Sequence, residues 1–301
     1  MALHRLTTIT LGVPDVAATA AFYRDFGLVE TEPATFATRD GGEQLRLAPA
    51  PRRRLLELGL GAHDADDLAR ISSALTRLGS EAVAGPTELR AVEPVTDTVV
   101  RVAVAPPIEA PVAATPATNR PGIVERHNAR ADGIERPEPV RPRKLGHVVL
   151  GSPDQAATQR FFTEGLGLKV SDEIAGIAAF LRCSTDHHNL LVQDAPVPYV
   201  HHTSWQVDDV DDVGRGAKAM LDADPSRHVW GLGRHYIGSN FFWYLRDPAG
   251  NFAEYYADMD VIDDDDTWAP TAIADLRALY AWGPPVPSSF LAPDDLAELT
   301  T

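Results

Sequence analysis

Two stretches of the chain share the same order of apolar and polar positions. Residues 10–30 read TLGVPDVAATAAFYRDFGLVE and residues 149–170 read VLGSPDQAATQRFFTEGLGLKV, at a constant offset of 139. In each stretch a strand-like run ends at a Pro-Asp pair, and apolar residues at helical spacing follow until Gly27 or Gly165. The pattern predicts a strand and then a helix in both copies. The repeat predicts two domains of the same fold.

The segments that follow keep the same order in both copies. In the first copy, alternating or β-branched runs predict strands at 35–38, 44–48 and 55–60, with a helix at 65–78. In the second copy, strands are expected at 177–182, 189–193, 200–207, 228–237, 240–246 and 251–257, with a helix at 210–221. The pattern therefore predicts an α+β protein with two tandem domains, each built from a pair of βαβββ modules.

The composition of the chain indicates where these domains end. We expect a first domain at 1–106, a proline-rich linker or strap at 107–143, a second domain at 144–262 and a tail at 263–301. The tail has helical spacing at 270–282. Its large aromatic residues are expected to pack against the domains, with a lid over the active site as the alternative; they are Trp268, Tyr280, Trp282 and Phe290.

Charge and cysteine content exclude several classes of function. The chain has 27 basic and 43 acidic residues, a formal net charge of −16, which argues against nucleic acid or an anionic membrane as partner. The acidic runs at 208–212 and 263–266 are predicted helix starts or turns. A single cysteine, Cys183, excludes an internal disulfide and a cysteine-based zinc site. With no membrane-spanning run and no secretory signal, we expect a soluble cytoplasmic protein.

Histidines gather in the second copy. Seven of the ten fall between 147 and 235: His147, His187, His188, His201, His202, His228 and His235. A lone histidine on an apolar strand is usually a core residue, but several histidines together with a strand glutamate favour a metal. Neighbours on a strand point to opposite faces, so we expect at most one of His201 and His202 to face a common cavity. The spacing does not choose between them, and the same ambiguity affects His187 and His188.

The turn signal DPAGN separates two strand-like runs near the end of the second copy. This places Tyr244 and Glu254 on neighbouring antiparallel strands.

The series LGHVVL, HHNLLV, HHTSWQVDD and GRHYIGSNFFWYLRDPAGNFAEYY resembles the type I extradiol ring-cleaving dioxygenases of the vicinal oxygen chelate superfamily. The resemblance covers nearly the whole chain, including its duplication. It implies the vicinal oxygen chelate fold, with His147, His202 and Glu254 as metal ligands in the second domain. Two imidazoles and one carboxylate leave one face of an octahedral Fe(II) open, and Mn(II) accepts the same set.

The resemblance also assigns roles around the metal. It implies that His188 lies beside bound O2 and that His235 and Tyr244 hydrogen-bond the substrate. His187 and His201 are then structural or rim residues.

The first copy departs from the family pattern. Thr8 stands where His147 stands in the repeat, and a provisional alignment puts Glu57 opposite His202. We therefore expect no metal site in the first domain.

The function that the resemblance implies is extradiol (meta) cleavage of a catechol by O2, as in the catabolism of aromatic hydrocarbons. The partners would be a small catecholic substrate and O2, and the protein is expected to be a homo-oligomer. The alternatives are a hydroquinone dioxygenase, a glyoxalase-like isomerase, or a non-catalytic binding protein of the same fold. The aromatic residues that could wall the pocket are Phe180, Trp230, Phe241, Phe242 and Trp243, while Arg234 and Arg246 are weak candidates for binding a substrate carboxylate.

Overall fold

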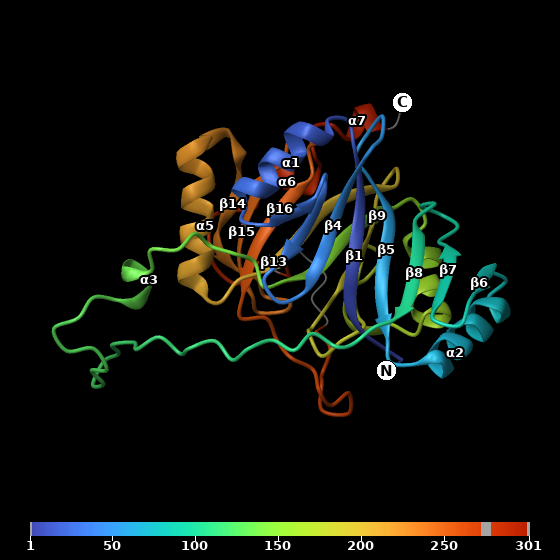
Figure 1. Ribbon diagram of the computed structural model, residues 1–301, viewed down its shortest axis with the longest axis horizontal. Coiled ribbons are helices and arrows are strands. Elements are labelled where there is room, and N and C mark those ends of the chain that lie inside the picture. Colours follow the sequence, from blue (N-terminus) through green and yellow to red (C-terminus); the bar gives the residue numbers. More distant parts are fainter. Residues whose placement is uncertain (1, 272–277, 300–301) are drawn as a thin grey trace.

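The protein consists of two eight-stranded sheets with the same strand order (Figure 1). The computed structural model describes residues 2–271 and 278–299. The first sheet runs β2-β3-β4-β1-β5-β8-β7-β6 and the second β10-β11-β12-β9-β13-β16-β15-β14. In both sheets the two central strands, β1 with β5 and β9 with β13, pair antiparallel. The repeated order confirms the predicted α+β architecture of two βαβββ pairs.

The first sheet is formed by residues 3–104. Its strands are β1 (Leu3–Val13), β2 (Val29–Glu32), β3 (Thr35–Thr38), β4 (Gly42–Pro49), β5 (Arg54–Ala62), β6 (Ala82–Ala84), β7 (Glu88–Val92) and β8 (Val99–Val104). Two helices connect them, α1 (Val16–Asp25) and α2 (Ala65–Arg77).

The second sheet is formed by residues 144–257. Its strands are β9 (Lys144–Ser152), β10 (Lys169–Ile174), β11 (Ala178–Arg182), β12 (Leu190–Asp194), β13 (Tyr199–Gln206), β14 (His228–Arg234), β15 (Phe241–Arg246) and β16 (Phe252–Ala257). Helix α4 (Gln155–Arg160) continues as a π-helical turn, Phe161–Gly165. Helix α5 (Val210–Ala223) is followed by a 3-10 turn, Pro225–Arg227.

The remaining segments are largely extended. The chain between the sheets runs along the outside of the molecule and contains only the short helix α3 (Asp132–Glu135) (Figure 1). The tail carries α6 (Ser288–Leu291) and α7 (Leu296–Leu299). Part of the helix expected at 270–282, namely residues 272–277, lies outside the described residues. Within the described part of the chain, no helix has the length and apolar character needed to cross a membrane.

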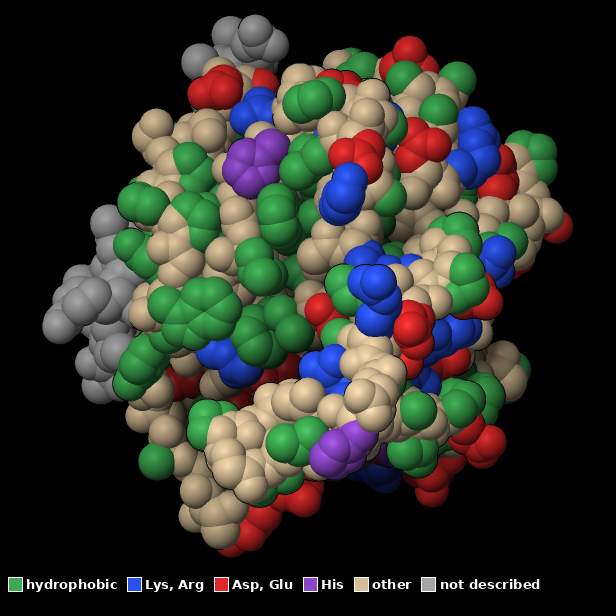
Figure 2. Space-filling view, turned by 90° about the vertical axis from the view of Figure 1, so that its left-hand side faces the viewer, with side chains coloured by type: hydrophobic (Ala, Val, Ile, Leu, Met, Phe, Trp, Pro, Cys, Tyr) green, Lys and Arg blue, Asp and Glu red, His purple; other side chains and the backbone are tan. Residues whose placement is uncertain are grey.

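Aspartates fix the starts of the four main helices. The side chains of Asp15, Asp64, Asp154 and Asp209 each accept a hydrogen bond from a backbone N–H in the first turn. The acidic run at 208–212 is thus a helix start, as predicted, and Arg136 binds Asp209 and Asp212 there. On the side of the molecule that carries α3 and α5, acidic and basic side chains accordingly lie close together (Figure 2).

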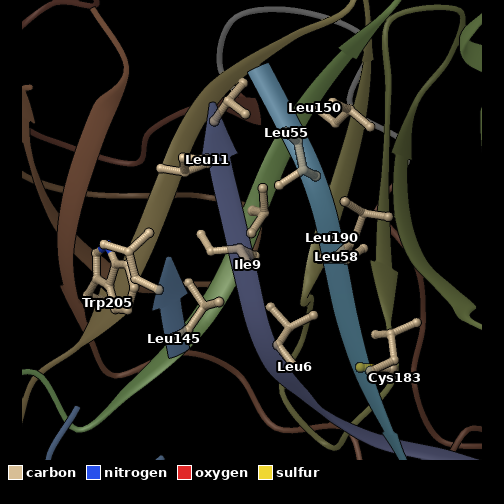
Figure 3. Packing of buried hydrophobic residues seen from close by; sticks show 14 of the residues in the cluster. Leu6, Ile9, Leu11, Leu55, Leu58, Leu145, Leu150, Cys183, Leu190 and Trp205 are labelled. Atoms are coloured by element: carbon tan, nitrogen blue, oxygen red, sulfur yellow. The ribbon is translucent and has the colours of Figure 1, made fainter. Parts of the chain in front are cut away.

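The two sheets share one hydrophobic core. Apolar side chains of β1 and β5, such as Ile9 and Leu58, point toward Leu145, Leu190 and Trp205 of the second sheet (Figure 3). These side chains are at most 2% exposed. The faces are also tied by polar contacts, since the Leu145 N–H donates to the Gln44 side chain. One face of the second sheet is therefore covered by the first domain, which leaves its other face for a cavity.

Candidate metal centre

The predicted ligands come from three adjacent strands of the second sheet. Ser204 of β13 pairs with His147 of β9 on one side and with Glu254 of β16 on the other, while His202 lies two residues before Ser204. Side chains two residues apart share a face of a strand. The register therefore brings the three ligand side chains together, and one ligand atom from each lies within 4.8 Å of the others.

The spacing of these atoms suits one metal ion. The His147 Nε2 atom is 3.2 Å from Glu254 Oε2 and 3.3 Å from His202 Nε2, and His202 Nε2 is 3.8 Å from Glu254 Oε2. Two ligand atoms at 90° around a metal, with bonds of about 2.1 Å, are about 3.0 Å apart. The three ligand atoms here are thus slightly farther apart than they would be around a bound octahedral metal. Glu254 is fully buried and its Oε2 atom has no hydrogen-bond partner among the described residues. A buried anionic oxygen of this kind requires a cation, and the donor set fits one.

The protonation states also suit a metal. Burial alone would raise the pKa of the Glu254 carboxyl, but neighbouring imidazoles, His147 first, outweigh burial and lower it, so the group is an anion. Burial holds the pKa of His202 well below its usual range, so this ring is neutral. Metal ligation needs an ionised carboxylate and a neutral imidazole.

His201 and His202 both line the cavity, which corrects the expectation that at most one of them could. The pairing of β13 with β9 shifts register between Val200 and His202, and this bulge breaks the strict alternation of side chains. The Nδ1 atoms of the two rings are 2.8 Å apart, and His201 Nε2 is 2.6 Å from the Phe290 carbonyl oxygen. Burial lowers the pKa of His201 to about 4. His201 thus contacts the ring of the ligand His202 through Nδ1 and fixes the orientation of that ring.

His188 lies against the metal ligands, and His187 lies behind it. The His188 ring centroid is 4.2 Å from that of His147, and His188 lines the cavity. Its Nδ1 atom is 3.0 Å from His187 Nδ1, and His187 Nε2 is 2.7 Å from an oxygen of the buried Asp172. Burial, followed by the neighbouring imidazoles, lowers the pKa of His188. The ring is therefore neutral.

His235 and Tyr244 form a hydrogen-bonded pair on the wall of the cavity. The His235 Nε2 atom is 2.8 Å from the Tyr244 hydroxyl, and His235 Nδ1 contacts the carbonyl oxygen of Leu279. A carbonyl only accepts, so His235 carries its proton on Nδ1 and Tyr244 donates to Nε2. Burial and the nearby Glu254 raise the pKa of Tyr244, so it stays protonated. The phenol oxygen then offers its lone pairs to a substrate hydroxyl.

Two contributors were missed by the sequence analysis. The Asn240 side chain donates to Glu254 Oε1 at 3.2 Å and so orients the carboxylate. Phe290 was expected to pack against the domains, with a lid over the active site as the alternative for the tail; it lines the cavity, and its ring centroid is 4.7 Å from that of Tyr244. Neither carried a pairing signal in the sequence, because Asn240 precedes β15 and lies four residues before Tyr244, the partner of Glu254, and Phe290 lies in the tail.

The cavity has a narrow inner part and a wide outer part. The inner part, about 70 Å³, holds the ligand histidines with His188, His235 and Tyr244. The outer part, about 390 Å³, is mainly apolar; its walls are Ile174, Ile177, Ala178, Phe180, Leu191, Gln193, Asp194, His201, Leu279, Phe290 and Leu291. The two parts share Phe180, Leu191 and Phe290 in their walls, so they adjoin each other.

Of the aromatic residues expected to wall the pocket, Phe180 does so. Trp230 and Phe242 pack in the cluster behind Tyr244 instead. Phe241 and Trp243 are partly buried and pack against the shared core. Arg234 pairs with Asp258 and Arg246 with Asp294, and neither lines the cavity.

The other aromatic residues of the tail pack as expected. Trp268 donates to the Ser171 carbonyl oxygen and lies 5.3 Å from His187. Tyr280 packs on Trp230, and Trp282 on Phe241.

Known proteins match both the sequence and the fold. Residues 144–255 match the family described as the Glyoxalase/Bleomycin resistance protein/Dioxygenase superfamily. Metapyrocatechase 2 of Cupriavidus necator is 32% identical over 307 positions, covering 96% of this chain and 92% of that protein. Biphenyl-2,3-diol 1,2-dioxygenase of Paraburkholderia xenovorans is 27% identical, covering 85% of this chain and 88% of that protein.

Among solved structures, the Mn(II)-bound glyoxalase of Novosphingobium aromaticivorans superimposes with a TM-score of 0.74 at 26% identity, covering 95% of this chain and 93% of that one.

Two further relatives are named by their metal. An iron-dependent extradiol dioxygenase of Rhodococcus jostii is 28% identical over 46% of this chain and 50% of that protein. A manganese-dependent 2,3-dihydroxybiphenyl 1,2-dioxygenase of Geobacillus genomosp. 3 is 26% identical over 44% of each.

Proposed function

The chain belongs to the Glyoxalase/Bleomycin resistance protein/Dioxygenase superfamily, and on this premise we propose that it is an extradiol dioxygenase that opens the ring of a catechol with O2. One observation carries the proposal: His147, His202 and Glu254 form a buried triad, and its two histidines line a cavity together with His188, His235 and Tyr244. We further propose these six as the site residues. The named relatives use either iron or manganese, and the triad accepts both.

The side chains around the triad supply proton transfer and positioning. When bound, the metal supplies the Lewis acidity and redox chemistry of ring cleavage. His188 Nε2 takes the proton of a catechol hydroxyl, since this ring borders the cavity and lies against the ligand His147. The Tyr244 oxygen accepts a hydrogen bond from the substrate, and a second proton on His235 would turn Tyr244 into a donor. Both atoms of O2 enter the product, so no external reductant is needed.

The outer cavity indicates what the catechol carries. Among the described residues, its walls are largely aliphatic or aromatic and include no lysine or arginine. The charged side chain in the described part of the wall is an acid, Asp194, which disfavours a substrate carboxylate. We propose a catechol with an uncharged apolar substituent, packed between Phe180 and Leu291.

A glyoxalase-like isomerase is the second candidate, because a Mn(II)-bound glyoxalase superimposes over nearly the whole chain. An isomerase would leave His188 and the pair of His235 and Tyr244 without a clear purpose. We therefore favour the dioxygenase.

The proposal is tested by anaerobic reconstitution with Fe(II) or Mn(II), followed by addition of O2 and a panel of catechols. Alkyl- or aryl-substituted catechols should give yellow ring-fission products, and His202→Ala should retain neither metal nor activity. A fully metal-loaded protein that isomerises a glyoxalase substrate and leaves every catechol intact would support the second candidate.

We propose in addition that the protein is a cytoplasmic homo-oligomer. The single cysteine fits a reducing compartment. The end strands of the sheets, β6 among them, leave apolar side chains such as Val83 exposed, at 79%. A monomer of 32.5 kDa in sedimentation at micromolar concentration would contradict this assembly.

A further inference from the structure

Asp172, His187 and His188 form a continuous hydrogen-bonded chain that ends at the cavity. Asp172 is 1% exposed and His187 is fully buried. The Asp172 carboxylate contacts His187 Nε2 at 2.7 Å, and His187 Nδ1 contacts His188 Nδ1 at 3.0 Å. The other Asp172 oxygen accepts from the backbone N–H of Thr271 in the tail. A bulge between Val170 and Asp172 in the pairing of β10 with β11 lets both Ser171 and Asp172 be buried.

The chemistry of Asp172 fixes the direction of every bond in this chain. A carboxylate only accepts, so His187 donates from Nε2. The neutral His187 then has a lone pair on Nδ1 and accepts from His188 Nδ1–H. This leaves His188 with a lone pair on Nε2, which makes no hydrogen bond to the described residues and can face the cavity.

The second histidine pair of the site is built in the same way. The Phe290 carbonyl oxygen only accepts, so His201 donates from Nε2 and receives the Nδ1–H of His202. His202 thereby keeps its Nε2 lone pair for the metal. In both pairs, an oxygen that can only accept a hydrogen bond fixes the tautomer of the histidine that it contacts, His187 or His201. That histidine in turn fixes which nitrogen of His188 or His202 keeps its lone pair.

We propose that Asp172 and His187 are positioning residues that hold His188 in the tautomer with its Nε2 lone pair toward the substrate. The inference rests on the proposed function of His188 as the proton acceptor. It gives His187, expected from the sequence to be structural, a part in the reaction that it performs without touching the substrate. A structural role alone would require the pair to fill space and hold the tail through Thr271, with no preference between the tautomers of His188.

The informative variant is Asp172→Asn, which keeps the shape of the side chain. The Thr271 N–H still needs an acceptor, so the amide oxygen takes that place and the NH2 group faces His187. Each bond in the chain then reverses, and His188 presents Nε2–H to the cavity. In serine proteases the same exchange of an orienting carboxylate for an amide preserves geometry and lowers the rate about 10⁴-fold.

We expect Asp172→Asn to retain its metal and its KM and to lose kcat by a factor on the order of 10²–10⁴. Asp186→Asn is the matched control: Asp186 precedes His187 and pairs with Lys144, outside the chain of bonds. It removes a neighbouring carboxylate and should keep wild-type kcat.

A readout independent of turnover is the ring nitrogen shift of His188 in the Zn(II)-loaded protein, measured by NMR with labelled histidine. Wild type and Asp186→Asn should show an unprotonated Nε2, and Asp172→Asn a protonated one. Absorbance of bound 4-nitrocatechol without O2 should report full deprotonation in wild type and incomplete deprotonation in Asp172→Asn.

An unchanged His188 tautomer in a folded Asp172→Asn protein would overturn the inference. If that variant does not fold, His187→Gln serves instead: protonated Nε2 should then become populated at His188, and its absence would equally overturn the inference. A wild type with the expected tautomer but no ring cleavage would contradict the proposed function and leave the positioning role standing.

Discussion

Glu57 occupies in the first sheet the position that His202 occupies in the second. Glu57 of β5 pairs with Thr10 of β1, and His202 of β13 pairs with Val149 of β9, which is residue 10 displaced by the repeat offset of 139. The provisional alignment of Glu57 with His202 is thereby confirmed. Glu57 pairs with Val99 of β8, as His202 pairs with Phe252 of β16. Arg101, two residues after Val99, therefore occupies the position of Glu254.

The first prediction concerns metal content. The first sheet has Thr8, Glu57 and Arg101 at the three ligand positions, and Glu57 binds Arg90 at 2.9 Å. A guanidinium at a ligand position repels a cation, so we expect one divalent metal per chain. Metal analysis should find one equivalent in wild type and almost none in His147→Ala. Two equivalents in wild type, or full retention in His147→Ala, would refute the assignment.

The second prediction separates proton transfer from metal binding. His188→Phe removes a ring that borders the cavity but no metal ligand. The variant should keep its iron and bind catechol, while its rate falls by a factor on the order of 10²–10⁴. Stopped-flow mixing of the anaerobic catechol complex with O2 measures this rate. Wild-type oxygen kinetics would show that another histidine, His187 first, performs the step.

The third prediction concerns Tyr244. Tyr244→Phe removes one hydroxyl and leaves His235 without its 2.8 Å partner, but proton transfer at His188 stays available. The rate should therefore fall between those of wild type and His188→Phe in the same stopped-flow experiment. A loss larger than that of His188→Phe would make Tyr244 the main proton carrier.

Much of the fold and the metal triad could be read from the sequence because both depend on local pattern and register. The DPAGN turn placed Tyr244 beside Glu254, and the two residues are indeed paired. The alternation rule failed at His201, because a bulge in β13 depends on pairing with β9 that no single segment encodes.

Contacts that join distant segments escaped prediction. Phe290 reaches His201 from the tail, and Asp172 reaches His187 from β10. Neither position carries a spacing signal, since the contacts arise only when the tail and the β11–β12 loop close over the sheet.

The fourth prediction tests the character of the outer cavity. Leu291 lines it and is 47% exposed, so Leu291→Arg can add a cation at its mouth without burying one. The ratio of kcat/KM for 3,4-dihydroxyphenylacetate to that for 3-methylcatechol should rise about two- to five-fold, as expected for a solvated ion pair. Val261→Arg, at a 62% exposed site outside the cavity, is the control. An equal rise in both variants would count against the assigned cavity.

The fifth prediction concerns Cys183. The thiol is fully buried, and burial raises its pKa, so little reactive thiolate forms in the folded protein. A thiol reagent such as DTNB should label Cys183 only after denaturation. Rapid labelling of the native protein would show that the core around this residue opens readily.

The most direct test of the central claim is isotope labelling of the ring-fission product. Enzyme reconstituted with Fe(II) is given an apolar-substituted catechol under ¹⁸O2, and the product is analysed by mass spectrometry against His202→Ala. We predict that the wild type forms a yellow ring-opened product that contains both atoms of O2 in addition to the two catechol oxygens. The variant should form no such product. A metal-loaded wild type that binds the catechol but yields no ring-opened product, or one without ¹⁸O, would contradict the assignment of an extradiol dioxygenase.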